Sequence, residues 1–435
     1  MKTMRVSFIL ACCLIAALSA ASEQHATKES SGLTVEPQAS LMGATGQSSW
    51  TQLAQFEHTH PSGGDQFGFS VTISGDTAVV GAPSGIDGLG AAYVFVKPAR
   101  GWGKMIQTAT LTASDEMAYD EFGASVSIDG NTVVVGSPCA SFYNSSCGKG
   151  AAYVFVKPAG GWRNMTETAK LSAADGNQND QFGYSVSISG STVVAGASNH
   201  AGQGATYVFV KKAQEWGQAA ELTASDGASG DGLGESVSVN GNAVAAGSPF
   251  KDSYQGAAYI FVEPGGGWKD ETQTAELTAS DGAPNYVFGL SLSVDANTAV
   301  VGAPGYGRDG GAYVYVEPPN GWTNATETAK LTGYSGRKGF ASSVVIGGST
   351  VLVGQPKLGR GSIGKKGAVF AFIKPADGWK STSKFSQELT AATGKYEHYF
   401  GTSVALTSDT AIIGAPNVTT DHGRPGSAYI FGRGK

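Results

Sequence analysis

Charged side chains are scarce in this sequence. Asp, Glu, Lys and Arg make up 15 % of the 435 residues, whereas about 25 % is usual in globular proteins. This leaves too little exposed charge for a chain of amphipathic helices, which argues against a helical bundle. Glycine, at 63 residues, is unusually frequent, and a hydrophobic share of 41 % is enough to fill a core. The composition therefore predicts a folded, all-β chain punctuated by glycine.

Long apolar runs are missing except near the N-terminus. There, Lys2 and Arg5 precede an apolar run from Val6 that ends in small residues. This order is typical of a cleaved secretory signal, because the run is shorter than the roughly 20 apolar residues that span a bilayer. An uncleaved anchor is the alternative. We expect residues 1–20 to be removed, residues 21–49 to form a flexible segment, and the mature protein to be soluble, secreted and extracellular, with no membrane span.

Cysteine is also rare, and two of the four residues, Cys12 and Cys13, lie in the expected signal. The remaining Cys139 and Cys147 are eight residues apart, which in an exported protein predicts one loop-closing disulfide. A metal-binding pair is the weaker alternative, because no further Cys or His lies nearby in the sequence. Four N-glycosylation sequons are expected at the surface if the source cell is eukaryotic: Asn144, Asn164, Asn324 and Asn417.

Positive charge is in deficit. The formal net charge is −6, and loss of the two cations Lys2 and Arg5 with the signal makes it −8. Nucleic acid and anionic membrane surfaces are therefore not expected as partners.

The chain from residue 50 to residue 435 is repetitive. Seven units each open with an aromatic residue or Leu followed by a small residue, at Phe67, Phe122, Phe182, Leu233, Phe288, Phe340 and Phe400. Four short segments rich in Val, Ile, Tyr and Phe recur in each unit, separated by turn residues, which predicts four strands. Tight dipeptides such as Gly75-Asp76 join the first two strands. Four antiparallel strands repeated seven times predict a seven-bladed β-propeller.

Tryptophan predicts how the ring closes. All seven Trp residues share one repeat position, but Trp50 stands before the first unit, whereas the last unit, from Phe400, ends after its third strand without a Trp. Residues 50–56 are therefore expected to complete blade 7 and to remove its open edge.

The unit starts and the later Gly-Ala-Pro segments, such as Gly81-Ala82-Pro83 and Gly302-Ala303-Pro304, resemble FG-GAP repeats, as in the head of integrin α subunits. The resemblance implies a seven-bladed propeller and an extracellular recognition role, without implying one ligand. Integrin-like repeats often insert an Asp-rich calcium loop between the two motifs. Here that interval holds only a two-residue turn, which cannot supply six oxygen ligands, so no cofactor is expected.

We call the face that carries the loops between second and third strands, and between successive blades, the loop face; it is the predicted binding surface. Asp pairs recur in its inter-blade loops: Asp115 with Asp120, Asp175 with Asp180, and Asp226 with Asp231. They predict either cation or polyol binding or, alternatively, capping of the turns by Asp side chains. Exposed aromatic residues would complete a binding face: Tyr119, Tyr143, Tyr254, Tyr306 and Tyr396.

Histidine gives a separate metal hypothesis. His58, His60, His398 and His422 map to loops around blade 7 and occupy no recurrent repeat position, which predicts a zinc or copper site or a pH-sensitive contact. Chance placement in loops is the alternative.

The sequence favours a non-catalytic binding module for an extracellular protein or glycan, of adhesion or matrix type. No hydrolase motif of the G-x-S-x-G or H-E-x-x-H kind is present. The alternatives are a secreted carbohydrate-active enzyme with acids from the loop face, or a structural matrix component. The oligomeric state is left open.

Overall fold

A computed structural model describes residues 49–59, 61–141, 147–306, 309–334, 338–357, 367–392, 398–419, 423 and 425–434. Several sequence predictions lie outside these residues: the signal and the N-terminal segment, His60, Tyr143, Asn144, Tyr396 and His422. Everything below concerns the described residues.

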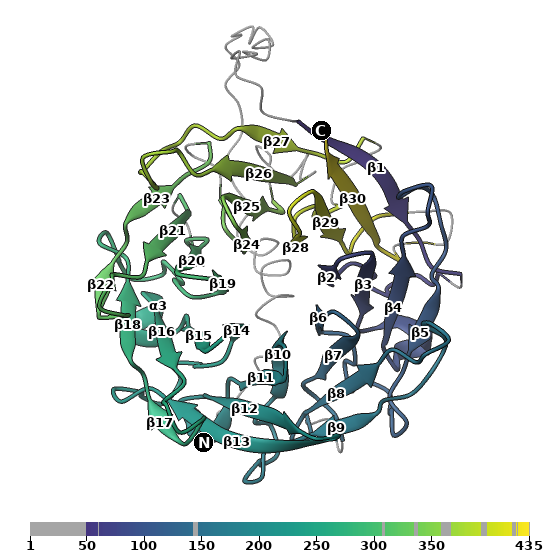
Figure 1. Ribbon diagram of the computed structural model, residues 1–435, viewed down its shortest axis with the longest axis horizontal. Coiled ribbons are helices and arrows are strands. Elements are labelled where there is room, and N and C mark those ends of the chain that lie inside the picture. The colour runs from purple at the N-terminus through teal and green to yellow at the C-terminus, as the bar shows by residue number, and fades with distance from the viewer. Residues whose placement is uncertain are drawn as a thin grey trace, which may run out of the picture. The chain divides into compact units, whose positions relative to one another are not determined.

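The described strands form seven sheets arranged as a ring (Figure 1). The first four blades, each given from the inner to the outer strand, are β2 (Ser70–Ser74), β3 (Thr77–Ala82), β4 (Ala91–Val96), β5 (Ala109–Leu111); β6 (Ser125–Asp129), β7 (Thr132–Ser137), β8 (Ala151–Val156), β9 (Ala169–Leu171); β10 (Phe182–Ser189), β11 (Thr192–Ala197), β12 (Ala205–Lys212), β13 (Glu215–Thr223); and β14 (Ser236–Asn240), β15 (Ala243–Ser248), β16 (Ala257–Val262), β18 (Ala275–Thr278). The last three are β19 (Ser291–Asp295), β20 (Thr298–Ala303), β21 (Gly311–Val316), β23 (Ala329–Leu331); β24 (Ser343–Gly347), β25 (Thr350–Gln355), β26 (Ala368–Ile373), β27 (Gln387–Leu389); and β28 (Ser403–Leu406), β29 (Thr410–Ala415), β30 (Ser427–Arg433), β1 (Trp50–Phe56). The predicted all-β, seven-bladed propeller is confirmed.

Closure by the N-terminal strand is confirmed as well. β1 pairs antiparallel with β30, from Trp50 opposite Arg433 to Phe56 opposite Ala428, and completes the sheet β1-β30-β29-β28. Phe56 is fully buried and stacks on Phe95 of β4 with ring centroids 4.2 Å apart. The closing strand therefore joins blade 7 to blade 1 as well as covering the edge of blade 7.

Two blades carry a short fifth strand that the sequence did not predict. β17 (Glu271–Thr272) pairs in parallel with β13, and β22 (Ala325–Thr326) pairs in parallel with β18. Both strands follow the Trp turn of the next blade along the chain. The chain of blade 4 therefore adds β17 to the outer edge of blade 3, and that of blade 5 adds β22 to the outer edge of blade 4.

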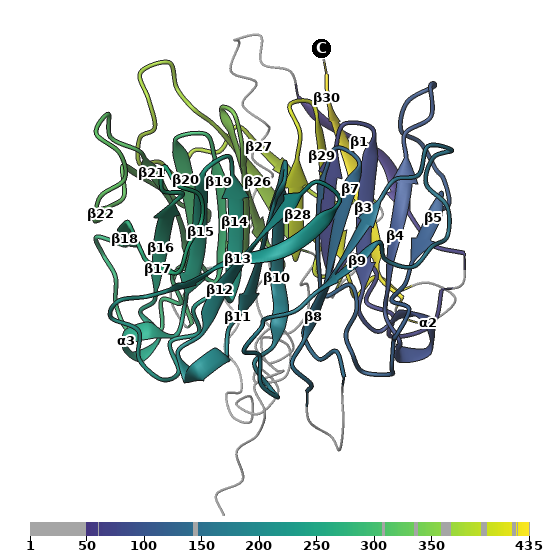
Figure 2. The same ribbon diagram turned by 60° about the horizontal axis from the view of Figure 1, so that its bottom comes forward.

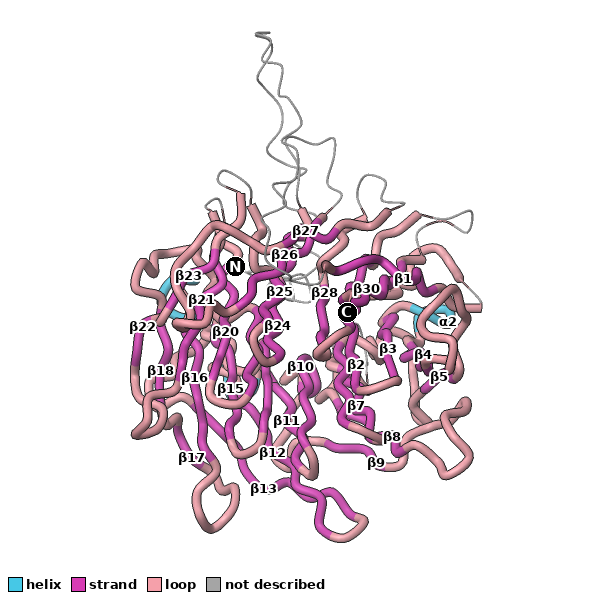
Figure 3. The backbone as a smooth tube through the Cα atoms, turned by 45° about the horizontal axis from the view of Figure 1, so that its top comes forward, coloured by secondary structure: helices cyan, strands magenta, loops and turns pink. Residues whose placement is uncertain are grey.

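Short helical turns mark the loop face. α2 (Gly85–Gly88), η1 (His200–Gly202) and α3 (Lys251–Tyr254) lie in the loops between the second and third strands of blades 1, 3 and 4. Figure 2 shows α2 and α3 at the same rim of the ring, and in Figure 3 the rest of the described backbone is strands and loops.

The repeated motif residues hold neighbouring blades together. A Ser at the inner strand of every blade donates its hydroxyl to a backbone carbonyl of the next blade over 2.7–3.1 Å, and Ser403 to Gly68 closes the circle: Ser70, Ser125, Ser185, Ser236, Ser291, Ser343 and Ser403. The glycine of the second motif lies against the same carbonyls. A Cβ on Gly247 would fall well inside the contact distance of the Gly289 carbonyl oxygen, so only glycine fits.

The core lies between blades. Buried apolar residues form seven clusters, each built from adjacent sheets. The aromatic residue of the first motif inserts there; for example, Phe122 packs edge-on against Tyr153 and Phe155 of β8. No helix among the described residues is long and apolar enough to cross a membrane.

Candidate functional site

The second Asp of each predicted pair is a buried turn cap. Asp120, Asp180 and Asp231 are all buried. Each accepts a hydrogen bond from the backbone N–H three residues earlier, over 3.1, 2.7 and 2.9 Å respectively. These carboxylates hold the inter-blade turn, which agrees with the capping alternative and leaves them no exposed ligand surface.

The first Asp of each pair is partly exposed and belongs to a recurrent unit. In blades 2 to 5 an Asp from the preceding loop accepts a hydrogen bond from a Tyr on the third strand. The pairs are Asp115 with Tyr153 (2.9 Å), Asp175 with Tyr207 (3.0 Å), Asp226 with Tyr259 (3.0 Å) and Asp281 with Tyr313 (2.8 Å). The carboxylate is thereby fixed with its second oxygen toward the surface.

In three of these four units that second oxygen pairs with a lysine. Lys170 contacts Asp115 at 2.5 Å, Lys251 contacts Asp226 at 2.7 Å and Lys330 contacts Asp281 at 2.5 Å. Burial by itself would raise the pKa of these three carboxyls. The hydrogen bonds from the lysine and the tyrosine outweigh it, so each pKa lies below its usual value. These units are self-neutralised.

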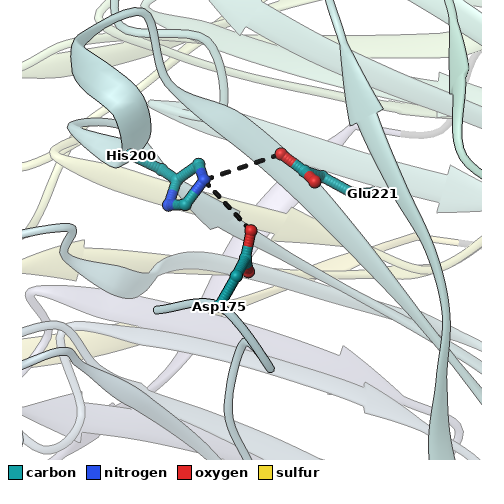
Figure 4. Close-up of side chains that lie close together, drawn as sticks. All are labelled: Asp175, His200 and Glu221. Atoms are coloured by element: carbon teal, nitrogen blue, oxygen red, sulfur yellow. Dashed lines mark ion pairs between the residues drawn. The ribbon is translucent and has the colours of Figure 1, made fainter. Parts of the chain in front are cut away.

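Blade 3 departs from this rule, because a histidine and a second carboxylate replace the lysine (Figure 4). His200, from η1, directs Nε2 at Asp175 Oδ2 over 3.4 Å and at Glu221 Oε1 over 3.6 Å. Its other ring nitrogen, Nδ1, lies 2.8 Å from Oδ2 of the buried Asp180. Among the described residues, Asp175, His200 and Glu221 are the one group of three His, Cys, Asp or Glu side chains whose ligand atoms all lie within 4.8 Å of one another.

The electrostatics of this group differ from those of the lysine units. The His200 side chain is only 9 % exposed. Burial raises the pKa of Glu221 above its ordinary value, with the charges of Asp175 and Asp270 acting in the same direction and His200 opposing them. Two carboxylates thus share one imidazole, whereas in each of the other three units an ammonium pairs with the Asp.

The predicted histidine group around blade 7 is placed differently. His58 is buried, with Nε2 3.3 Å from Asp65, and it packs against Phe67 and Tyr93 of blade 1. His398 is also buried. Neither belongs to the three-residue group on blade 3.

The blade 3 group was not predicted from the sequence, where only the histidines around blade 7 were singled out. The repeat phase contains the missing signal. His200 stands 18 residues after Phe182, and Lys251 stands 18 residues after Leu233, so both occupy one repeat position. Comparing the chemistry at that position would have placed His200 beside Asp175.

The aromatic candidates lie at the surface where the structure describes them. Tyr119 is 67 % exposed, and Tyr306 and Tyr254 are 43 % and 36 % exposed. Six of the large apolar residues exposed in the described part of the chain lie in loops of the loop face: Ile86, Met117, Tyr119, Tyr254, Tyr306 and Tyr334. The other two, Leu53 and Ile106, lie on β1 and in a loop of the opposite face.

Backbone hydrogen bonds join these loops across blades. Tyr119 N–H donates to Gly88 O over 3.0 Å, which brings its loop to α2, and Tyr306 N–H donates to Asn285 O over 2.7 Å. Asn285 N–H in turn donates to Ser253 O of α3 over 3.2 Å. Tyr254 and Tyr306 therefore stand on loops joined through Asn285, and the loop of Tyr119 is joined to α2.

The predicted disulfide between Cys139 and Cys147 is present. The sequon residues Asn164 and Asn324 are exposed, and each accepts a backbone N–H of the preceding blade through Oδ1, from Thr110 over 2.9 Å and from Glu276 over 2.8 Å. Asn417 is half-buried. The glycan-accepting nitrogens of Asn164 and Asn324 are not used in these two bonds, so glycosylation there stays a prediction.

The fold and its face define a class: an all-β propeller with a rigid inner ring and a set of variable loops on one side. The model of the FG-GAP repeat family matches residues 50–95, 105–155, 165–209, 216–261, 272–315 and 384–431. The chain belongs to the FG-GAP repeat family. No curated protein matches the sequence. Most of blade 6 lies between matched segments, and there the two motifs are altered to Phe340-Ala341 and Gly354-Gln355-Pro356.

A calcium loop of the integrin kind does not fit this chain. The connection that would carry it is a two-residue turn in blades 1 to 6, as shown by the pairs Ser74 with Thr77 and Asp129 with Thr132. In blade 7 four residues separate Leu406 from its partner Ala411. Turns of this length cannot wrap six or more oxygen ligands around one ion.

Proposed function

We propose that this protein is a secreted, non-catalytic binding module that recognises an extracellular protein or glycan, of adhesion or matrix type, through its loop face. One observation carries the proposal: the exposed large apolar side chains gather in the loops of that face, on a scaffold whose blades are locked together. Exposed aromatic and apolar residues on loops held by a rigid framework are typical of recognition surfaces. Membership of the FG-GAP family and the disulfide are compatible with an extracellular role.

Tyrosine is suited to either kind of partner. Its ring stacks on the apolar face of a sugar and also anchors protein interfaces, while its hydroxyl keeps a hydrogen bond to water or ligand. The net negative charge of the chain disfavours nucleic acid as a partner.

The test is binding of the purified mature protein to a glycan array and to a panel of extracellular-matrix proteins. Tyr119→Ser, Tyr254→Ser and Tyr306→Ser are expected to weaken a saturable interaction at least tenfold, because each removes an exposed anchor. Ile106→Ser is the matched control, since Ile106 is 64 % exposed but lies on the opposite face. The assignment to the loop face is refuted if Ile106→Ser abolishes binding while the three tyrosine variants bind as tightly as the wild type. No binding to either panel would favour the structural-component hypothesis.

A secreted carbohydrate-active enzyme is the second hypothesis, and one observation favours it. Burial raises the pKa of Glu221, and its carboxylate oxygen lies within 4.8 Å of that of Asp175. Retaining glycosidases hold an acid of raised pKa about 5–5.5 Å from a second carboxylate. The enzyme hypothesis is supported if the wild type hydrolyses oligosaccharides and Glu221→Gln does not. Unchanged oligosaccharides would leave the binding module as the better account.

A further inference from the structure

The blade 3 group has the composition of a cation site. We propose that Asp175, His200 and Glu221 bind a divalent transition-metal ion, with Zn²⁺ as the ion that best fits these ligands. This inference is independent of the ligand of the loop face, and it concerns residues far from the turn in which integrin-type repeats hold calcium.

Two of the three distances between the ligand atoms already suit such an ion, and the third, between the Asp175 and Glu221 oxygens, is at most 4.8 Å. Ligands about 2.0–2.2 Å from a tetrahedral zinc ion lie about 3.3–3.6 Å from one another. His200 Nε2 is 3.4 Å from Asp175 Oδ2 and 3.6 Å from Glu221 Oε1. The side chains therefore need little movement to surround the ion.

The surroundings orient each ligand. Nδ1 of His200 is held at 2.8 Å by Asp180, a buried carboxylate that is itself fixed by the Asn177 N–H. A metal-binding histidine usually donates the N–H of its other ring nitrogen to a carboxylate. This hydrogen bond sets the tautomer that presents Nε2 to the metal. Tyr207 occupies Asp175 Oδ1, which leaves Oδ2 for the ion.

Blade 4 has acids at the same positions as blade 3, together with a lysine that supplies a positive charge. It has the same acid at each position, Asp226 for Asp175 and Glu276 for Glu221, and Glu276 pairs across the strands with Tyr259 as Glu221 does with Tyr207. The repeat position of His200 is filled there by Lys251, whose ammonium contacts Asp226. In blade 3 an imidazole takes the place of that ammonium, so this blade lacks the fixed positive charge that Lys251 supplies in blade 4, and a bound ion can supply it instead.

The ligand set selects the kind of ion. One imidazole and two carboxylates suit zinc and its neighbours among the transition metals, whereas calcium and magnesium prefer oxygen ligands alone. The Asp175 side chain is 50 % exposed, so a fourth position faces solvent and is open to water or to a group from a binding partner.

The test is isothermal titration of Zn²⁺ into the EDTA-treated and dialysed mature protein, with Co²⁺ absorption as a second readout of the coordination geometry. His200→Lys copies blade 4, and Glu221→Lys copies blades 2 and 5, where Lys170 and Lys330 occupy the same strand position. Both variants therefore keep side chains that this fold already accepts. Each is expected to lower the affinity of the protein for one equivalent of zinc at least a hundredfold. Asp180→Asn is expected to lower this affinity 10- to 100-fold, because Asp180 orients His200 through Nδ1.

Glu276→Gln is the matched control for Glu221→Gln, because the two glutamates share one repeat position and only Glu221 faces a histidine. Zinc affinity is expected to fall in Glu221→Gln and to stay unchanged in Glu276→Gln. The proposal is overturned if the wild type takes up no zinc, or if His200→Lys and Glu221→Lys both bind it as tightly as the wild type. In either case His200 only contacts the two acids and holds no metal.

Discussion

At the scale of single residues, one repeat position can change its chemistry while the backbone around it stays the same. The position that follows the first motif is Ala124 in blade 2 and Leu290 in blade 5, but Glu235 in blade 4. Glu235 is buried, and burial raises its pKa to about 7, against the hydrogen bonds from Tyr184 and Ser198 that lower it. A carboxyl buried at this position makes the stability of this fold depend on pH.

The sign of that dependence follows from the raised pKa. An acid whose folded-state pKa lies above its unfolded value binds more protons in the folded state, so stability falls as pH rises from about 4.5 to about 7. Glu235→Gln removes the penalty and is expected to raise the free energy of unfolding by up to roughly 3 kcal/mol above pH 7, with no gain near pH 4.5. Urea titrations of both proteins at several pH values would measure this. A constant difference across that range would rule out titration of Glu235 as its cause.

At the scale of elements, the closing strand β1 matters for two blades at once. Its main chain pairs with β30, while Phe56 packs against Phe95 in the cluster of blade 1, and Trp50 packs in the cluster shared by blades 6 and 7. β1 therefore joins the first and last blades, and its pairing with β30 leaves no exposed sheet edge at this point.

Phe56→Ala is expected to lower the free energy of unfolding by about 3–5 kcal/mol, because it empties a fully buried site between two blades. Leu53→Ala, on the same strand but 46 % exposed, is the control and should cost much less. Chemical denaturation gives both values. A similar loss in the two variants would mean that the strand contributes through its backbone alone.

At the scale of the whole molecule, the propeller separates a uniform scaffold from a variable face. The ring of inter-blade hydrogen bonds and the close glycine contacts repeat in all blades, while acids, aromatic residues and His200 differ from loop to loop. A ligand bound at one blade of such a molecule affects the whole fold through its stability. If the ligand binds only the folded state, it raises the free energy of unfolding.

Zinc should stabilise the wild-type protein accordingly. At a free zinc concentration 100 times the dissociation constant, the expected gain in unfolding free energy is about 2.7 kcal/mol. His200→Lys should gain no more than about 0.4 kcal/mol at the same zinc concentration, because its affinity is at least a hundredfold lower. Its stability without metal should be close to that of the wild type. Thermal unfolding with zinc and with EDTA measures both. An equal gain in the variant would place any bound zinc elsewhere on the chain.

The sequence by itself determined the number of blades, the order of strands within them, the closing strand and the disulfide. The strands and turns rest on short-range periodicity and turn residues, which are local in the chain. The closing strand rests on the repeat phase of Trp50 against the unit that begins at Phe400, which can be counted along the sequence although the two segments lie at opposite ends of it. For the Asp pairs the sequence left two roles open, turn capping and the binding of a cation or polyol, because repetition at a fixed phase is compatible with both.

Only the tertiary structure decided which role each Asp has. Asp180 and Asp175 are five residues apart, yet one is buried under its turn and the other reaches the surface, since burial depends on the neighbouring blade. The meeting of Asp175, His200 and Glu221 likewise depends on an inter-blade loop, a helical turn and an outer strand folding together. Side chains from three separate segments converge through packing, and packing is a property of the folded ring rather than of any one stretch of sequence.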